Sequence, residues 1–167
     1  LGLERAGFKV VAFSEFNKAA IASHLANFPD SEHLVEPTSK ASDITKIPNS
    51  VFEKFAGADL VFAGFPCQGF SRAGKKKKED PRNQMFQQFV RATSQIKPRF
   101  VIGENVTGLL TMKSGPNEED PLMIDLIRAA FLQIGYELSH KILEGTAFGV
   151  PQKRKRILIV GWDKSRV

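Results

Sequence analysis

The sequence predicts an α/β fold in which a mostly parallel sheet carries helices on both faces. Short, nearly continuous apolar runs recur along the chain, as expected of strands buried on both sides. Longer segments between them have apolar residues that repeat at helical spacing. Strands that alternate with amphipathic helices are typical of a parallel sheet. The chain shows no internal repeat and no interdomain linker, so we expect residues 1–167 to belong to one domain.

Five segments are predicted as strands: residues 9–15, 58–66, 99–104, 138–143 and 156–162. The segment 58–66 (ADLVFAGFP) is a nearly continuous apolar run, and we expect it to be buried on both faces of the sheet. The segment 138–143 has the least regular apolar pattern of the five.

Three helices are predicted between these strands. The first covers residues 17–27, directly after the first strand. The third has Asp120 as its N-cap, Pro121 as its first residue and Gly135 at its end. The second ends before Pro98, and its apolar residues recur at helical spacing: Phe86, Phe89, Val90, Thr93 and Ile96. The apolar face of the third consists of Met123, Leu126, Ile127, Ala130, Phe131 and Ile134.

The composition excludes several classes of protein. The chain is 42% hydrophobic and 25% charged, which is ordinary for a globular domain and unlike a disordered, collagen-like or coiled-coil protein. No apolar run approaches the roughly 20 residues of a membrane-spanning helix. One cysteine cannot form an internal disulfide or a multi-thiolate metal site. We expect an intracellular protein without a metal, cytoplasmic in a prokaryote or nuclear in a eukaryote.

The charge balance favours a polyanionic partner. The chain has 24 Lys and Arg against 18 Asp and Glu, a net charge of +6, and its pI is about 9.6. Basic contacts to phosphates release counterions and so favour binding to nucleic acid, although many basic domains bind none. The run Lys75–Lys78 is interpreted either as a mobile loop near phosphates or as a purely solubilising segment.

Three unusual clusters follow predicted strands. They are Glu15–Phe16 after the first strand, residues 65–68 (FPCQ) after the second, and Glu104–Val106 after the third. In open parallel sheets, ligands bind outside the carboxyl ends of the strands. The three clusters therefore predict where a binding site lies, but not what it binds.

Cys67 is the only thiol of the chain and lies in a Pro-Cys-Gln turn. A free cysteine is usually a small buried hydrophobic residue. Here Pro66 fixes the approach to the turn and Gly69 frees its exit, so the thiol could instead be presented to solvent. Nearby positive charge would favour the thiolate, which is the nucleophilic form.

Glu104 ends an apolar strand and has two interpretations. It could satisfy the next turn or cap a short helix. It could also lie partly desolvated in a cleft and hold or donate a proton near neutral pH. Because adjacent parallel strands are about 4.8 Å apart, neighbouring strand ends could place Cys67 and Glu104 on either side of a planar ring.

Residues 152–156 (QKRKR) alternate in type just before a strand. In an extended segment, Gln152, Arg154 and Arg156 would share one face and the two lysines the other. A basic run is usually a solvated surface, but Arg offers a planar fork of donors that fits a base edge or a phosphate.

These clusters, in this order, resemble motifs of the cytosine carbon-5 methyltransferases. Residues 64–71 (GFPCQGFS) resemble catalytic motif IV, Glu104–Val106 resembles motif VI, and Gln152–Arg156 resembles the Gln-x-Arg-x-Arg of motif VIII. The eight-residue match, followed at plausible distances by the other two, is highly specific. The resemblance covers essentially the whole chain and implies a Rossmann-like methyltransferase fold that depends on S-adenosylmethionine.

The resemblance implies that the protein is a DNA (cytosine-5-)-methyltransferase. In that family a cysteine thiolate attacks carbon 6 of a flipped-out cytosine, and this role falls to Cys67. Glu104 would contact ring nitrogen 3 and the exocyclic amine, while Arg154 and Arg156 would help to hold the base and its phosphate. Carbon 5 then takes the methyl group, and loss of its proton with elimination of the cysteine releases the product. The other motif residues expected at the substrate are Gln68, Ser71, Asn105, Val106 and Gln152.

The resemblance also implies a cofactor pocket. Glu15 resembles the acidic residue that binds the ribose hydroxyls, and Phe16 lies where the family has a residue packed on the adenine. Asp43 and Ile44 resemble motif III at the adenine edge. Near the catalytic strand, the expected S-adenosylmethionine residues are Gly64, Pro66 and Met85, the last in a place often held by leucine.

The resemblance further implies that the chain is part of a catalytic domain. The family's first strand and its Phe-x-Gly-x-Gly loop would precede Leu1, and the target-recognition domain and last motifs would follow Val167. We expect these 167 residues by themselves to bind cofactor and DNA weakly or not at all. In its full-length form the protein is expected to be a monomer that acts on double-stranded DNA.

Two alternatives stay open at this point. The transfer-RNA branch of the same family has the same cysteine, glutamate and arginine motifs, and DNA is favoured because DNA enzymes are the larger branch. A non-catalytic relative that only binds nucleic acid would be expected to lose Cys67 or Glu104, and both are present. Restriction-modification and epigenetic roles would leave the same motifs.

Overall fold

The computed structural model describes residues 2–66, 85–115 and 117–167. By its internal contacts the chain divides into an N-terminal unit, Leu1–Lys54, and a C-terminal unit, Phe55–Val167. The longest helices of the described residues have 11 residues each, and none has the length and apolar composition of a membrane span.

The N-terminal unit holds a small parallel sheet and short helices. Its elements are α1 (Gly2–Arg5), β1 (Ala12–Phe13), α2 (Lys18–Asn27), β2 (Glu32–His33), the 3-10 turn η1 (Ile44–Lys46) and α3 (Asn49–Glu53). β1 pairs with β2 in parallel, so the strand predicted over 9–15 is confirmed but shorter. The predicted helix over 17–27 is confirmed as α2. The Asn17 side chain caps its start by accepting hydrogen bonds from the N–H groups of Ala19 and Ala20.

The Phe13 side chain anchors β1 to its neighbours. Its ring stacks on His24 of α2 at a centroid distance of 3.7 Å and on His33 of β2 at 4.8 Å. The His33 Nε2 lies 2.9 Å from the carbonyl oxygen of Glu15, so β2 also contacts the backbone just after β1.

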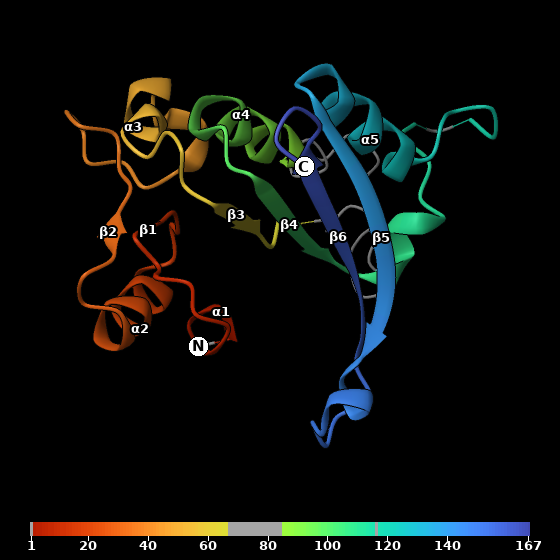
Figure 1. Ribbon diagram of the computed structural model, residues 1–167, viewed down its shortest axis with the longest axis horizontal. Coiled ribbons are helices and arrows are strands. Elements are labelled where there is room, and N and C mark those ends of the chain that lie inside the picture. Colours follow the sequence, from red (N-terminus) through yellow and green to blue (C-terminus); the bar gives the residue numbers. More distant parts are fainter. Residues whose placement is uncertain (1, 67–84, 116) are drawn as a thin grey trace. The chain divides into compact units, whose positions relative to one another are not determined.

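The C-terminal unit contains a four-stranded sheet in the order β3-β4-β6-β5 (Figure 1). The strands are β3 (Leu60–Ala63), β4 (Phe100–Asn105), β5 (Tyr136–Glu144) and β6 (Lys155–Asp163), which confirms the remaining four predicted strands. β3 and β4 are parallel, whereas β6 runs antiparallel to both of its neighbours. The sheet is therefore mixed, because β5 and β6 form a hairpin whose tip is the 3-10 turn η5 (Gly145–Phe148).

Two helices cover one face of this sheet. They are α4 (Phe86–Ile96) and α5 (Met123–Gln133), and the 3-10 turn η4 (Thr107–Leu110) follows β4. The predicted ends of both helices are confirmed. α4 ends at Ile96, and its C-cap Lys97, with a φ of 51°, directly precedes Pro98. Ile134 is the C-cap of α5, and Gly135 comes next with a φ of 88°.

The predicted start of α5 is wrong. Leu122 is the N-cap, and Asp120 and Pro121 precede the helix. The chain there is held extended, because Leu122 forms an antiparallel bridge with Lys113 and the Met123 N–H donates to the Met112 carbonyl. The Asp120 carboxylate instead accepts from the Asn117 N–H at 2.6 Å.

The expectation that the 58–66 strand is buried on both faces is not met within the C-terminal unit. β3 is the edge strand of the sheet, and the Phe62 side chain is 50% exposed. The pairing of Phe62 with Ile102 and of Ile102 with Val160 places these residues on one face, and Val160 is 40% exposed as well. In this unit α4 and α5 pack on the opposite face only.

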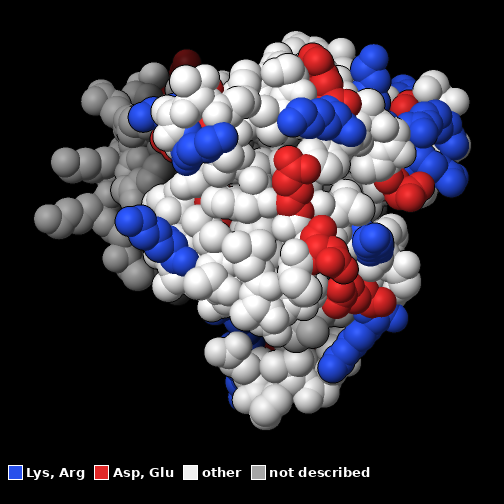
Figure 2. Space-filling model, turned by 90° about the vertical axis from the view of Figure 1, so that its left-hand side faces the viewer, with Lys and Arg blue, Asp and Glu red and all other residues white. Residues whose placement is uncertain are grey.

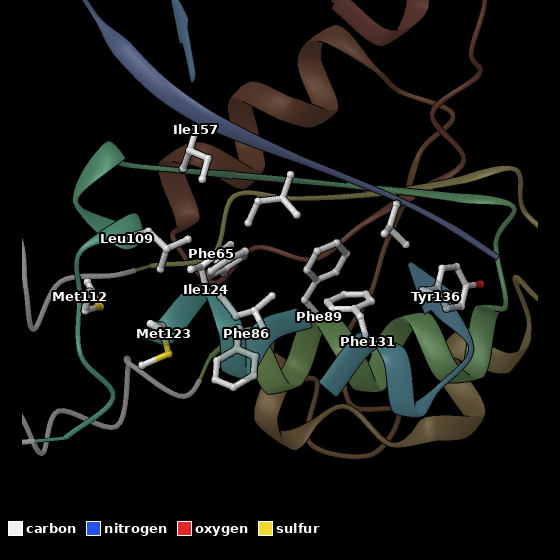
Figure 3. Close-up of a cluster of buried hydrophobic side chains, with 13 residues drawn as sticks. Phe65, Phe86, Phe89, Leu109, Met112, Met123, Ile124, Phe131, Tyr136 and Ile157 are labelled. Carbon is white, nitrogen blue, oxygen red and sulfur yellow. The ribbon is translucent and has the colours of Figure 1, made fainter. Parts of the chain in front are cut away.

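The hydrophobic core lies between the sheet and these two helices (Figure 3). The rings of Phe89 and Phe131 meet edge to face at 4.9 Å, and Phe65 lies 6.1 Å from Phe89. A Cβ on Gly103 would lie 3.3 Å from ring carbons of both Phe65 and Phe89, so the absence of a side chain on β4 lets these rings approach the strand. The core thereby fixes Phe65, two residues beyond the end of β3.

Candidate active site

The carboxyl ends of β3 and β4 lie side by side, as the sequence predicted. Their register ends at the pair Ala63–Gly103. Gly64 then comes close to Glu104, because a Cβ on Gly64 would lie 3.8 Å from the Glu104 Oε2. Cys67, Gln68 and Ser71 of the same motif lie outside the described residues, as does the Lys75–Lys78 run.

Glu104 and Arg156 form an ion pair on the sheet face opposite the helices. The Arg156 Nε lies 2.8 Å from the Glu104 Oε1, and the two side chains are 26% and 34% exposed. β4 and β6 bring them together, since Glu104 pairs with Leu158 and Arg156 lies two residues away on the same face. Partial exposure keeps the stabilisation from such a pair small, about 0–1 kcal/mol, so its main effect is to orient both groups.

Asn105 ends β4 on the face that is packed against the core. Asn105 is 4% exposed. Its Nδ2 donates to the Phe65 carbonyl at 3.1 Å, and its Oδ1 accepts from the Val106 N–H at 2.8 Å. Val106 is the N-cap of η4 and is only partly buried. The side chain of Asn105 thus bonds to two backbone groups of the protein.

A cavity of about 330 Å³ lies at the tip of the β5–β6 hairpin, and Arg156 of the ion pair is part of its lining. Gln152, Arg154 and Arg156 all line it, so the structure brings the three residues of the third motif together. Gln152 does so through a turn and not through an extended segment, because its N–H donates to Val150 and its carbonyl accepts from the Arg154 N–H. The apolar part of the lining consists of Leu143, Phe148, Val150 and Leu158.

Phe148 and Val150 were missed by the sequence interpretation. They are 65% and 50% exposed and flank Gly149, whose φ is 76°. The signal was two apolar residues in a short Gly- and Pro-containing segment directly before the basic motif. Exposed apolar side chains next to arginines provide a wall against which a sugar or a base can pack.

The candidate cofactor residues divide between the two units. In the N-terminal unit, the Glu15 Oε1 accepts from the N–H groups of Phe16 and Asn17, each at 2.8 Å, and the Phe16 ring is 76% exposed. The Asp43 Oδ1 accepts from the Thr45 hydroxyl and N–H, and these bonds lower the pKa of Asp43. Ile44 begins η1 and is partly buried.

The other three lie in the C-terminal unit. Gly64 and Pro66 follow β3, and Met85 directly precedes α4. Gly64 is exposed, while Pro66 and Met85 are partly buried.

Charged side chains of both signs lie on the face drawn in Figure 2. Among the described residues there, Lys and Arg side chains are separated by Asp and Glu side chains and by uncharged surface. The described Lys and Arg side chains are thus not gathered into one stripe on that face. Arg154 and Arg156 at the cavity are the more specific candidates for contact with a nucleic acid.

Comparison with known protein families shows which family the chain belongs to. The family of C-5 cytosine-specific DNA methylases matches residues 1–167. The chain belongs to this family. The family resemblance inferred from the sequence and the Rossmann-like methyltransferase fold are thereby confirmed.

Curated methylases resemble the chain over most of its length. It is 37% identical over 164 residues to the Type II methyltransferase M1.HphI of Haemophilus parahaemolyticus, covering 96% of the chain and 42% of that protein. It is 31% identical over 171 residues to the Type II methyltransferase M.XorII of Xanthomonas oryzae pv. oryzae, covering 98% of the chain and 38% of that protein. The chain therefore spans less than half the length of these relatives.

Solved structures show the same fold. A candidate DNA modification methyltransferase from an E. coli prophage superimposes with a TM-score of 0.74 at 28% identity, covering 96% of the chain and 42% of that protein. The DNMT2 protein of Spodoptera frugiperda superimposes with a TM-score of 0.71 at 22% identity, covering 97% of the chain and 45% of that protein. The second likeness shows the fold alone.

Proposed function

We propose that the protein is a DNA (cytosine-5-)-methyltransferase that transfers a methyl group from S-adenosylmethionine to carbon 5 of a flipped-out cytosine. The contact between Glu104 and Arg156 is the observation that supports this best. These residues come from two separate motifs and meet next to Gly64, on the strand end that leads to Cys67.

Cys67 is the proposed nucleophile. Its sulfur forms a bond to carbon 6, and the electrons of the carbon 5–carbon 6 double bond move toward carbon 5. S-adenosylmethionine, when bound, supplies the methyl group that carbon 5 accepts. Loss of the carbon 5 proton and cleavage of the carbon 6–sulfur bond then restore the double bond and free the thiolate. The cytosine must leave the duplex for the sulfur to reach it.

Glu104 is proposed to hold the cytosine edge and to support a proton at ring nitrogen 3 during the attack. Arg156 binds its Oε1, and the Oε2 points toward Gly64 at the end of β3. Within the described residues, this arrangement assigns one oxygen to orientation and leaves the other for the ring. The proton at ring nitrogen 3 offsets the negative charge that the thiolate brings to the ring, and a carboxylate already held in place stabilises that proton without having to reorganise first.

Arg154 and Gln152 are proposed to hold the flipped nucleotide in the cavity that Arg156 helps to line. The guanidinium group offers planar donors to a phosphate or to the base oxygen. Phe148 and Val150 supply the apolar part of the lining, against which the sugar packs.

Residues of the N-terminal unit fit the adenosine part of S-adenosylmethionine. A carboxylate can accept both ribose hydroxyls, and within the described residues Glu15 uses only its Oε1 for hydrogen bonds. The exposed Phe16 ring offers a face to the adenine, and Asp43 and Ile44 would contact its edge. In the C-terminal unit, Gly64, Pro66 and Met85 are the proposed contacts near the catalytic strand.

The family of C-5 cytosine-specific DNA methylases supports DNA as the substrate, which we propose to be double-stranded. The names of the relatives support modification in a restriction-modification system as the role. M1.HphI and M.XorII are both Type II methyltransferases. We accordingly propose that the protein methylates a defined DNA site, recognised with segments other than the strand ends described above.

Covalent trapping tests the proposed chemistry. The full-length natural protein is incubated with S-adenosylmethionine and DNA containing 5-fluorocytosine, with Cys67→Ser as the control. Fluorine cannot leave as a proton does, so the enzyme should stay bonded to the DNA and migrate as a complex in denaturing gels, while the control should not. An adduct with the matching RNA and none with DNA would move the assignment to an RNA substrate, and no adduct with either would contradict the proposal.

A further inference from the structure

Asn105 connects the ends of two strands that are far apart in sequence. Its Nδ2 donates across 40 residues to the carbonyl of Phe65, and its Oδ1 accepts from the next N–H of its own chain, that of Val106. It is one of three buried polar or charged residues in the described part of the chain, at 4% exposure. A buried amide in this position satisfies backbone groups and offers little surface to a substrate.

The Phe65 carbonyl lies just beyond the last residue pair that joins β3 to β4. The β3–β4 register ends at Ala63–Gly103, and Pro66 has no N–H with which to continue a ladder. The Phe65 ring is packed in the core against Phe89. The Phe65 backbone is held separately, because its carbonyl accepts a hydrogen bond from the Asn105 side chain. Phe65 is therefore fixed twice, just before the chain continues to Pro66 and Cys67.

We propose that Asn105 is a positioning residue that fixes the direction in which the chain leaves β3 toward Cys67. The inference rests on the proposed function, because that function makes Cys67 the nucleophile. It changes the role expected from the sequence, where Asn105 was a candidate for substrate contact. Asn105 acts through the Phe65–Pro66 backbone, and Glu104, its neighbour on the opposite face of β4, acts on the substrate.

A purely structural hydrogen bond would have different consequences. Such a bond affects how much protein is folded, not the rate of each folded molecule. Tyr136 provides a matched comparison, since its hydroxyl donates to the Pro98 carbonyl and the residue is also buried, near the start of β4. Tyr136→Phe removes one buried hydrogen bond from a side chain to a backbone carbonyl, far from the carboxyl ends of β3 and β4.

The test compares Asn105→Asp, Asn105→Ala and Tyr136→Phe in the full-length protein. Asn105→Asp keeps the size of the side chain but turns an oxygen toward the Phe65 carbonyl. Methyl transfer to DNA is measured at saturating substrates and per folded molecule, with the folded fraction taken from thermal unfolding. A nucleophile displaced by about 1 Å loses about 100-fold in rate, so we expect kcat to fall by that order in both Asn105 variants. KM for DNA and for S-adenosylmethionine should change by less than about threefold, because the proposal assigns Asn105 no contact with either.

Three results would overturn the inference. These are an unchanged kcat in the folded Asn105 variants, a loss that only follows the folded fraction, and an equal loss of kcat in Tyr136→Phe. Failure of the proposed function is recognised separately, since the wild-type protein would then form no trapped adduct and transfer no methyl group.

Discussion

Among single residues, the ion pair of Arg156 with Glu104 has the most direct consequence for activity. Arg156→Lys retains the charge but loses the planar Nε contact to the Oε1 at 2.8 Å. We expect kcat for methyl transfer to fall by about 10- to 100-fold, because the carboxylate loses its fixed orientation. Steady-state kinetics with labelled S-adenosylmethionine measures this.

Arg128→Lys is the matched control for that substitution. Arg128 also pairs with a carboxylate, that of Asp125 at 3.3 Å, but the pair is exposed and lies on α5. Its kcat should stay within about twofold of wild type, since exposed pairs contribute about 0–1 kcal/mol and Arg128 contacts Asp125 and His140 but none of the described site residues. Equal effects of the two substitutions would contradict the assignment of Arg156.

Residue identities at the site were more predictable than residue contacts. Glu104, Arg154 and Arg156 stand out in the sequence because charged groups follow or precede apolar strands. The burial of Asn105 and its bond to Phe65 could not be predicted, since they depend on the register of two strands and on core packing. Phe148 and Val150 were missed because exposed apolar residues carry no periodic signal.

Among the elements, β6 packs closely against both neighbouring strands at Gly161, where there is no room for a side chain. A Cβ on Gly161 would clash with Leu138 Cδ2 and would lie 2.6 Å from Val101 Cγ2, so an added methyl group must displace side chains of both neighbouring strands, β5 and β4. We expect Gly161→Ala to lower the free energy of unfolding by about 1–3 kcal/mol. Urea denaturation followed by circular dichroism measures the change.

Gly108→Ala serves as the control. Gly108 lies in η4, and a Cβ there would meet no atom of the described residues within 4 Å. The unfolding free energy should change by less than about 0.5 kcal/mol, as for an ordinary surface substitution. A destabilisation as large as that of Gly161→Ala would show that close packing around β6 is not the cause.

Element types were predicted better than their environment. The periodicity of α4 and α5 and the apolar runs of β4 and β6 are local properties, and these elements are confirmed. The start of α5 was misplaced because a tertiary bridge, Lys113–Leu122, overrides the local capping signal of Asp120. The antiparallel direction of β6 also has no local signal, since it follows from the hairpin that β6 forms with β5.

For the molecule as a whole, the dependence of stability on alkaline pH tests whether Tyr136 is buried in the core. Burial of the phenol is the main cause that raises the pKa of Tyr136 to about 12. In the unfolded chain a tyrosine ionises near pH 10, so the stabilising difference is complete below pH 10 and is lost as the pH rises from about 10 to 12. The difference in unfolding free energy between wild type and Tyr136→Phe should therefore shrink between pH 9 and pH 11.5 in urea titrations.

The charged side chains that change ionisation over this range, mainly lysines, are the same in both proteins and cancel in that difference. A constant difference across the pH range would mean that the folded protein accommodates the ionised Tyr136 as well as water does. It would contradict the packing of this residue at the edge of the core.

The central claim concerns the chemistry of the whole protein, and the identity of its methylated product tests it most directly. DNA treated with the full-length protein and S-adenosylmethionine is digested to nucleosides and separated by liquid chromatography with mass spectrometry. We predict 5-methyl-2′-deoxycytidine from the wild-type protein and none from Cys67→Ser. Methylation of the exocyclic amine of cytosine or adenine, or equal product from Cys67→Ser, would contradict the account.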